Sequence, residues 1–218
     1  MSKNSKISIT VIRRLPRYYR FLLQLKKEGI MRISSRELSE RMGLTASQIR
    51  QDLNCFGGFG QQGYGYDVDK LYGEIGGILG LDNSYRAVLI GVGNLGKAVT
   101  THIKFEERGF ILDAMFDREQ SVVGSQLQNH TIRDISTLPE YLADNTPDAA
   151  FLCLPYDSVE PIAELLYKAG VRCFWNFSHF DLTVKYGDVI MENVHLTDSL
   201  MTLCYRMNDR DESHREEK

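Results

Sequence analysis

The sequence predicts an α/β protein with an N-terminal winged helix-turn-helix domain, a Rossmann-like doubly wound parallel sheet and a C-terminal helix. Two capped helices flank a glycine turn near residue 43, and a glycine-rich corner follows an apolar run near residue 90. Strand and helix patterns then alternate along the chain. We therefore expect a winged-helix domain over residues 1–80, a Rossmann domain over 81–195, a last helix over 196–208 and a charged, disordered tail over 209–218.

Charge is distributed unevenly along the 218 residues. Residues 1–50 hold twelve Lys and Arg against three Asp and Glu, a net of +9, so the remainder carries −12 of the total −3. A basic end on an acidic body favours binding to a polyanion, although a solvated basic face has the same composition. No apolar run approaches the roughly 20 residues that a membrane span needs. We expect a cytoplasmic protein with no membrane partner.

The cysteines are Cys55, Cys153, Cys173 and Cys204, which lie far apart with no CxxC pair. This spacing predicts neither a metal site nor a disulfide framework. We expect reduced thiols and no bound metal, and a redox role for Cys55 stays open.

The first helix is expected over residues 12–27, where apolar side chains repeat at helical spacing. Pro16 suits its first turn or a kink. The Ser-Ser-Arg-Glu of residues 34–37 predicts a capping box that opens a helix to about residue 42. Residues 45–48 predict a second box, opening a helix through residue 56, and Gly43 lies in the turn between the two helices. This order is the helix-turn-helix pattern.

The second of these helices divides into two faces. Ile49, Leu53 and Phe56 recur at inward spacing, whereas the outer face is short, polar and free of acids except for Asp52 at its edge. Arg reads guanine, and Gln or Asn reads adenine, through paired hydrogen bonds. An ordinary solvated helix pair is the alternative. We expect double-stranded DNA to be contacted by Arg13, Arg14, Arg17, Ser47, Gln48, Arg50, Gln51 and Asn54.

Residues 56–66 hold five glycines in eleven positions with alternating aromatics, which excludes a helix and predicts two short strands around a tip. This hairpin would be the wing, with Gln61, Gln62 and Tyr64 near the DNA. A plain hairpin without DNA contact is the alternative.

A strand over residues 86–90 runs directly into a GxGxxG motif at 91–96, after which helical spacing continues to about residue 108. That context makes the motif informative. Gly91 permits the turn, Gly93 lets backbone amides approach a pyrophosphate, and Gly96 allows close helix packing. We expect the cofactor NAD(H) to be bound by Gly91, Val92, Gly93, Asn94, Leu95 and Gly96.

Asp117 ends the next strand, over residues 110–116, and lies 21 residues beyond Gly96. An acid at this position accepts both ribose hydroxyls and repels a 2′-phosphate, which favours NAD(H) over NADP(H). Arg118 is adjacent and weakens that preference. A Rossmann scaffold that has lost its ligand is the alternative.

The alternation continues to the end of the sheet. Ligands of such sheets bind beyond the carboxyl ends of the strands, which places Pro155, Tyr156 and residues 176–179 near the cofactor. Helices are expected over 137–143, 159–169 and 196–207, and strands over 149–154, 172–177 and 188–194. We expect no enzyme, because the Rossmann unit leaves no room for a catalytic domain.

Together these stretches resemble the Rex family of redox-sensing repressors. The resemblance covers almost the whole chain and is carried by residues 13–20, 32–38, 56–66 and 91–98. It implies a homodimer that exchanges its C-terminal helix, a palindromic operator, and release from DNA when NADH binds. It also implies that Phe177 lies near the nicotinamide and that His102 belongs to the cofactor-dependent switch.

Some positions depart from the family pattern. Gln51, Gln61 and Gln62 stand where many relatives carry Lys or Arg. His102, His179 and His195 stand at positions of Tyr, Pro and Asp, which puts the switching behaviour in question. Other functions left open are a winged-helix regulator with a different or structural nucleotide, and an NAD-dependent oxidoreductase.

Overall fold

The computed structural model describes residues 7–61 and 64–216 and divides into two units, Met1–Asn83 and Ser84–Lys218. The boundary falls later than residue 80 because the chain beyond the last helix of the first unit still bonds back to it. The Leu79 amide donates to the Ile75 carbonyl, and the Leu81 amide donates to the Gly76 carbonyl.

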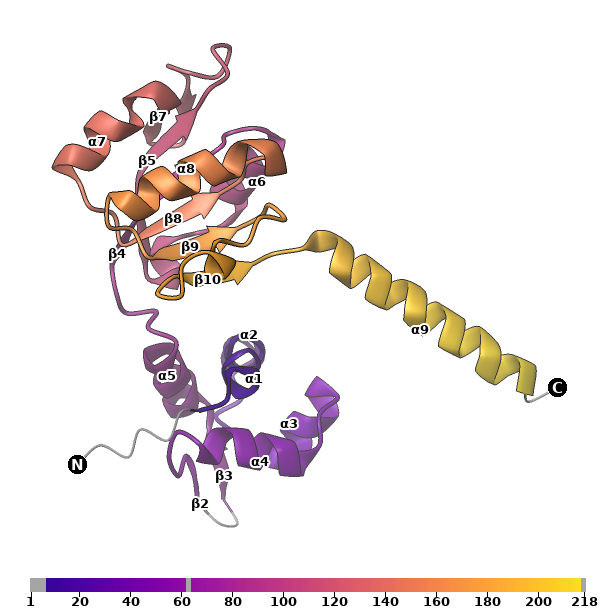
Figure 1. Cartoon of the computed structure of the whole chain (residues 1–218). Helices are drawn as coiled ribbons and strands as arrows, with labels where there is room; N and C mark the ends of the chain where they lie inside the picture. The colour runs from indigo at the N-terminus through magenta and orange to yellow at the C-terminus, as the bar shows by residue number, and fades with distance from the viewer. Residues whose placement is uncertain (1–6, 62–63, 217–218) are drawn as a thin grey trace. The chain divides into compact units, whose positions relative to one another are not determined.

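The first unit is a winged helix-turn-helix domain (Figure 1). Its apolar core is built from side chains of every helix from α2 to α5 and from two of its short strands. The elements in chain order are α1 Ile9–Ile12, α2 Leu15–Lys27, β1 Arg32–Ile33, α3 Ser35–Met42, α4 Ala46–Asn54, β2 Gly60–Gln61, β3 Gly65–Asp67 and α5 Val68–Ile78.

The helix expected over residues 12–27 begins later, at residue 15, and a separate short helix precedes it. α1 ends before Arg13, and α2 begins at Leu15 with Pro16 in its first turn. Proline has no backbone N–H, but the N–H groups of the first helical turn have no partner within the helix. Its fixed φ also suits a helix start. Leu15, Tyr18 and Leu22 are fully buried, as the periodicity predicts.

The helix-turn-helix forms as the capping residues predict. Ser34 and Glu37 make the complete capping box of α3, and Gly43 ends α3 in the left-handed region at φ 63°. The second box is only half formed: Thr45 caps the Gln48 amide, but the Gln48 side chain bonds Asp52 instead of turning back. α4 ends at Asn54 rather than residue 56, because Gly57 follows at φ 132°.

The wing is a three-stranded antiparallel sheet in the order β1-β3-β2. A Cβ on Gly65 would lie 2.6 Å from the Ile33 carbonyl oxygen, and its φ is 69°, so the strands pair this closely only with glycine there. Residues 62–63, which include the predicted tip residue Gln62, lie outside the described part of the chain.

The second unit is a Rossmann-like sheet (Figure 1). In the described residues, seven strands take the order β10-β9-β8-β4-β5-β7-β6, and all neighbours pair in parallel except β6 with β7. The order reverses between β4 and β8, which creates the crevice where such sheets bind ligands. The elements are β4 Tyr85–Ile90, α6 Asn94–His102, η1 Glu106–Arg108, β5 Phe110–Asp117, β6 Gln126–Leu127, β7 His130–Asp134, η2 Ile135–Thr137, α7 Leu138–Asp144, β8 Ala149–Leu152, α8 Tyr156–Lys168, β9 Cys173–Asn176, η3 Leu182–Val184, β10 Ile190–Asn193 and α9 Leu196–Glu216.

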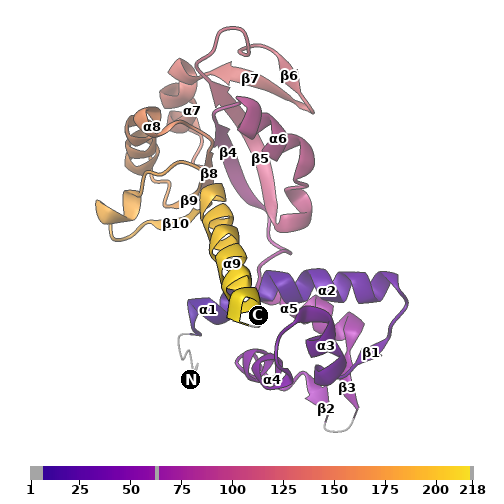
Figure 2. The ribbon, with the colours of Figure 1, turned by 90° about the vertical axis from the view of Figure 1, so that its right-hand side faces the viewer.

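Helices cover the two faces of this sheet unequally. α7 and α8 lie on one side and α6 on the other (Figure 2). One apolar cluster joins α7 and α8 to the sheet, and a second joins α6 to the opposite face near β4 and β5. On the α6 side, β9 is only partly covered and Ile190 of β10 is exposed.

Two expectations for this unit were wrong, and one hairpin was not foreseen. α6 ends at His102 instead of near residue 108, because Phe105 leaves the helix and its ring stacks on Phe151 at 5.1 Å. The β6–β7 hairpin was missed, since only Ile132 of β7 is buried. α9 continues to Glu216, so most of the tail at 209–218 is helical, as mixed charges at helical spacing allow.

Candidate functional site

The glycine corner between β4 and α6 is shaped by backbone contact. Gly91 has φ 93°, and a Cβ there would lie 2.5 Å from the Cys153 carbonyl oxygen. A Cβ on Gly96 would lie 2.0 Å from the Gly91 carbonyl oxygen, so α6 begins in contact with the corner. Gly93 precedes α6 with no side-chain cap, and the first turn has no acid. Helix-start amides that no side chain caps are a site for phosphate.

A cavity of about 660 Å³ opens beside this corner. Its lining contains the predicted cofactor residues Gly91, Gly93, Asn94, Leu95, Asp117, Arg118 and Pro155. Sequence reasoning missed the opposite wall, formed by Ile135, Leu154, Asp157, Ser158, Pro161 and Ile162. The sequence did contain a signal for this wall. Parallel strands end at the same edge of the sheet, so the start of α8, which follows β8, had to lie near the glycine corner, which follows β4.

Asp117 is held in place before any ligand arrives. Its Oδ2 accepts from the Val92 amide at 2.5 Å, and its Oδ1 accepts from the Glu119 amide at 2.8 Å. A carboxylate has about four acceptor positions, so two remain for ribose hydroxyls. Arg118 lies beside it and donates to Ser158 Oγ at 3.2 Å. The fixed acid and the apolar wall suit the adenosine half of a dinucleotide.

Several predicted cofactor residues do not line this cavity. Val92 and Gly96 belong to the corner but are buried. Tyr156 is exposed and Phe177 packs on Trp175, with ring centroids 4.5 Å apart; neither lines this cavity. His102 was expected at the cofactor, but it ends α6 and lines a different pocket. Eight residues of helix separate it from the α6 start, or about 12 Å.

The outer face of α4 carries one continuous polar stripe. Ser47, Arg50, Gln51 and Asn54 are all exposed and follow one another at helical spacing. Arg50 Nη1 donates to Ser35 Oγ on α3 at 3.0 Å. A helix with such a face, preceded by a tight turn, is the form that enters the major groove.

Three other predicted DNA-contact residues have partners inside the unit. Arg14 forms a paired contact with Asp52, Gln48 donates to the same carboxylate, and Arg17 donates to the Met42 carbonyl. Asp52 was expected at the edge of the outer face but is 1% exposed. It lies on the same inward side of α4 as Ile49, because residues three apart on a helix are neighbours.

The wing presents Tyr64, which is 70% exposed. The Arg32 guanidinium lies over its ring at 5.9 Å, and Arg32 Nη1 donates to the Tyr64 carbonyl at 3.4 Å. Arg32 therefore places a cation beside the wing, which the sequence reasoning missed because β1 was not foreseen.

The two remaining histidines of interest stack on each other. The His179 and His195 rings are 4.9 Å apart with an angle of 9°, next to the start of α9.

Near the glycine corner, burial raises the pKa of the Cys153 thiol to about 12, which makes it a poor nucleophile. No group of three His, Cys, Asp or Glu in the described residues is placed to hold a metal ion.

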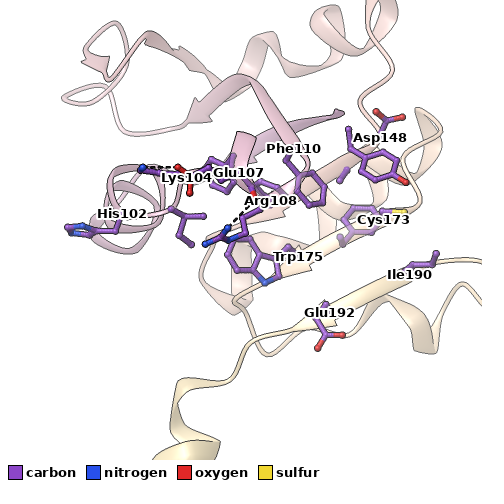
Figure 3. A pocket seen from close by; sticks show the side chains of 16 residues that line it. His102, Lys104, Glu107, Arg108, Phe110, Asp148, Cys173, Trp175, Ile190 and Glu192 are labelled. Atoms are coloured by element: carbon purple, nitrogen blue, oxygen red, sulfur yellow. Dashed lines mark hydrogen bonds and ion pairs between the residues drawn. The ribbon is translucent and has the colours of Figure 1, made fainter. Parts of the chain in front are cut away.

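A larger pocket of about 1000 Å³ lies on the open face of the sheet (Figure 3). Adjacent strands contribute two rows of paired residues, Ala149–Cys173–Ile190 and Phe151–Trp175–Glu192. Phe110 completes an aromatic floor, and Lys104 and Arg108 lie near its edge. This surface is apolar and broad.

Comparison with known proteins decides the family. A model described as "Putative DNA-binding protein N-terminus" matches residues 6–54, and one described as "CoA binding domain" matches residues 82–180. The redox-sensing transcriptional repressor Rex of Thermoanaerobacter pseudethanolicus is 52% identical over 211 residues, which cover 97% of this chain and 94% of that protein. The chain belongs to the Rex family of redox-sensing transcriptional repressors. A Rex repressor of Clostridium botulinum is 49% identical over 208 residues, covering 95% of this chain and 99% of the relative.

Solved Rex structures share the whole architecture. The crystal structure of RSP, a Rex-family repressor, in complex with β-NAD+ and operator DNA has a TM-score of 0.86 and 48% identity, covering 97% of both chains. RSP in complex with β-NADH has a TM-score of 0.87 and 46% identity, covering 99% of this chain and 100% of that one. The Rex resemblance and the predicted fold class are confirmed. The helices of the described residues include none long and apolar enough to cross a bilayer.

Proposed function

We propose that this Rex-family chain is a cytoplasmic DNA-binding repressor that senses the ratio of NADH to NAD+ and releases operator DNA when it binds NADH. The observation that carries the proposal is the union of two sites in one chain. The exposed stripe of α4 suits base reading, and the cavity at Gly91 and Asp117 suits a dinucleotide. RSP, its relative, has been crystallised with NAD+ and operator DNA and with NADH.

The cofactor is held by the chain's own groups at both ends of the cavity. Amides at Gly93 and Asn94 bind the pyrophosphate, and the Asp117 carboxylate binds the ribose hydroxyls. The nicotinamide supplies the redox difference that is sensed. No catalytic step is part of the proposal, because a repressor needs only different affinities of two conformations for the ligand. A hundredfold difference in affinity corresponds to about 2.7 kcal/mol of coupling.

We infer that the repressor is a homodimer in which α9 of each chain packs against the partner chain. Leu196, Leu200, Leu203 and Met207 repeat along one side of α9 and are 52–67% exposed. The open sheet face with Trp175 is an apolar surface of matching character. Burying such a side chain contributes roughly 1.5–3 kcal/mol. A second copy is therefore the occupant that we infer for this face, and a twofold dimer suits a palindromic operator.

The dimer is tested by light scattering on purified full-length protein. Leu200→Lys places a charge on the apolar side of α9 and should yield the monomer mass of 24.9 kDa. Thr202→Lys is the matched control, because Thr202 is exposed on α9 away from that side. A Leu200→Lys protein that stays dimeric would contradict the exchange.

The redox function is tested by titrating DNA binding with NADH and with NAD+. The duplex is selected from a random-sequence pool by the wild-type protein. NADH should lower the affinity for the duplex much more than NAD+ does, and identical curves would refute redox sensing. Calorimetry with NADPH, ATP and coenzyme A tests the main alternative, a different nucleotide ligand, which the match to a CoA-binding model makes worth measuring.

A further inference from the structure

A buried acid lies beneath the stripe that reads DNA. Asp52 is on α4, 1% exposed, between Ile49 and Leu53 on the inward face. If this position only had to pack α4 against the core, a Leu or Val would suffice. A buried carboxylate costs several kcal/mol unless it is paired and hydrogen-bonded. Its partners therefore reveal what it holds in place.

Four donors satisfy the Asp52 carboxylate. Arg14 donates from Nε to Oδ2 at 2.6 Å and from Nη2 to Oδ1 at 2.7 Å. Tyr18 Oη donates to Oδ2 at 2.8 Å, and Gln48 Nε2 donates to Oδ1 at 2.8 Å. Each oxygen thus accepts two hydrogen bonds. A paired arginine contact fixes the plane of the carboxylate as well as its distance.

The donors join α2 to α4. Arg14 and Tyr18 belong to the start of α2, and Gln48 belongs to the first turn of α4. α2 is itself fixed to α5 by the stacked rings of Tyr19 and Tyr72, whose centroids are 4.3 Å apart. α5 leads along the chain into β4 of the second unit. Within the first unit, α4 is therefore tied through α2 to the helix that ends at the inter-unit linker.

The rotational setting of α4 matters for base reading. A helix with side chains has a radius of about 5 Å, so a rotation of about 20° moves its surface by roughly 2 Å. Recognition geometry tolerates roughly 0.5 Å. Ile49 and Leu53 are nondirectional contacts that permit such a rotation, whereas a paired Arg–carboxylate contact resists it.

We propose that Asp52 is a positioning residue for DNA recognition: with Arg14, Tyr18 and Gln48 it fixes the rotation of α4 against α2, without contacting DNA itself. The inference rests on the proposed DNA-binding function. It assigns Arg14 and Gln48 to this buried cluster and leaves Ser47, Arg50, Gln51 and Asn54 as the reading face.

The experiment compares Asp52→Asn with wild type on two duplexes of equal length, one selected by wild type from a random pool and one with the same composition scrambled. Affinity for the selected duplex should fall at least about tenfold, the equivalent of one lost base contact. Affinity for the scrambled duplex and the salt slope should stay within about twofold, because the phosphate-binding charges are unchanged. Asp69→Asn is the control, since it makes the same change in the exposed Lys26–Asp69 pair between α2 and α5.

Equal preference for the selected duplex in Asp52→Asn and wild type would overturn the proposal, as would a parallel loss on both duplexes. If Asp52→Asn does not fold, Tyr18→Phe decides, because it keeps the buried ring and removes one donor. It should weaken the selected duplex alone by a few-fold, and unchanged selectivity would overturn the proposal. A wild-type protein that enriches no duplex from the pool would instead refute the DNA-binding function itself.

Discussion

Replacing Gly93 by alanine separates ligand binding from folding at the glycine corner. Gly93 has φ −70° and ψ −164°, which alanine adopts without strain, and nothing in the protein lies within 4 Å of the added Cβ. The unfolded chain loses freedom, so the ligand-free protein should gain about 0.4–1 kcal/mol in free energy of unfolding. That gain corresponds to roughly 1–4 °C in melting temperature.

The same methyl group should impair NADH binding, because it fills the space through which a pyrophosphate approaches the backbone amides. Losing one hydrogen bond to a charged group costs about 1.5–3 kcal/mol, or roughly 10- to 150-fold in Kd. Calorimetric titration gives the Kd, and thermal melting without ligand gives the stability. The expected result is a more stable protein that binds NADH poorly.

Gly96→Ala is the contrasting variant. Its Cβ would lie 2.0 Å from the Gly91 carbonyl oxygen, so α6 must shift away and the ligand-free protein should melt at a lower temperature. Stability and NADH binding should be lost together there. Wild-type NADH affinity in Gly93→Ala would refute the placement of the pyrophosphate at this corner.

Three further outcomes are expected. Asp117→Asn should reduce the preference for NADH over NADPH by about tenfold or more, since the negative charge that repels a 2′-phosphate is gone. Calorimetry with both nucleotides measures the two affinities. An unchanged ratio of these affinities would exclude ribose binding by Asp117. Arg50→Ala should cost about 1–3 kcal/mol in operator affinity by fluorescence anisotropy, whereas Arg36→Ala, which removes an exposed pair with Glu40, should cost little; equal losses would show that the stripe is misassigned. Burial opposes ionisation of Asp52, but hydrogen bonds from Arg14, Tyr18 and Gln48 prevail and hold its pKa below the ordinary 3.8. Its contribution to stability is therefore present above about pH 4 and lost as the pH falls through the lower folded pKa, so urea midpoints should drop more on acidification in wild type than in Asp52→Asn.

The sequence predicted most securely those features that depend on short stretches of backbone. Gly91 and Gly96 sit where only glycine is sterically possible, and the Ser34 capping box needs only residues within one helical turn. The parallel sheet with helices on both faces followed from the alternation of strand and helix patterns. These constraints are local, so a single sequence contains them.

Features that depend on distant partners were not predictable in this way. Asp52 looked like an edge residue because its main partner, Arg14, lies 38 positions earlier in the sequence. His102 was placed at the cofactor by resemblance, although within one chain α6 carries it away from the glycine corner. The charged end of the chain was expected to be disordered because its composition is strongly polar, but α9 continues to Glu216.

The exposed apolar side of α9 has a consequence for how the repressor is made. In the proposed dimer the partner covers this side of α9, so a newly synthesised single chain displays Leu200, Leu203 and Met207 to solvent. Assembly then depends on protein concentration, and scarce chains are open to proteolysis or to capture by chaperones. The proposed exchange of α9 would therefore make the stability of the repressor depend on its concentration.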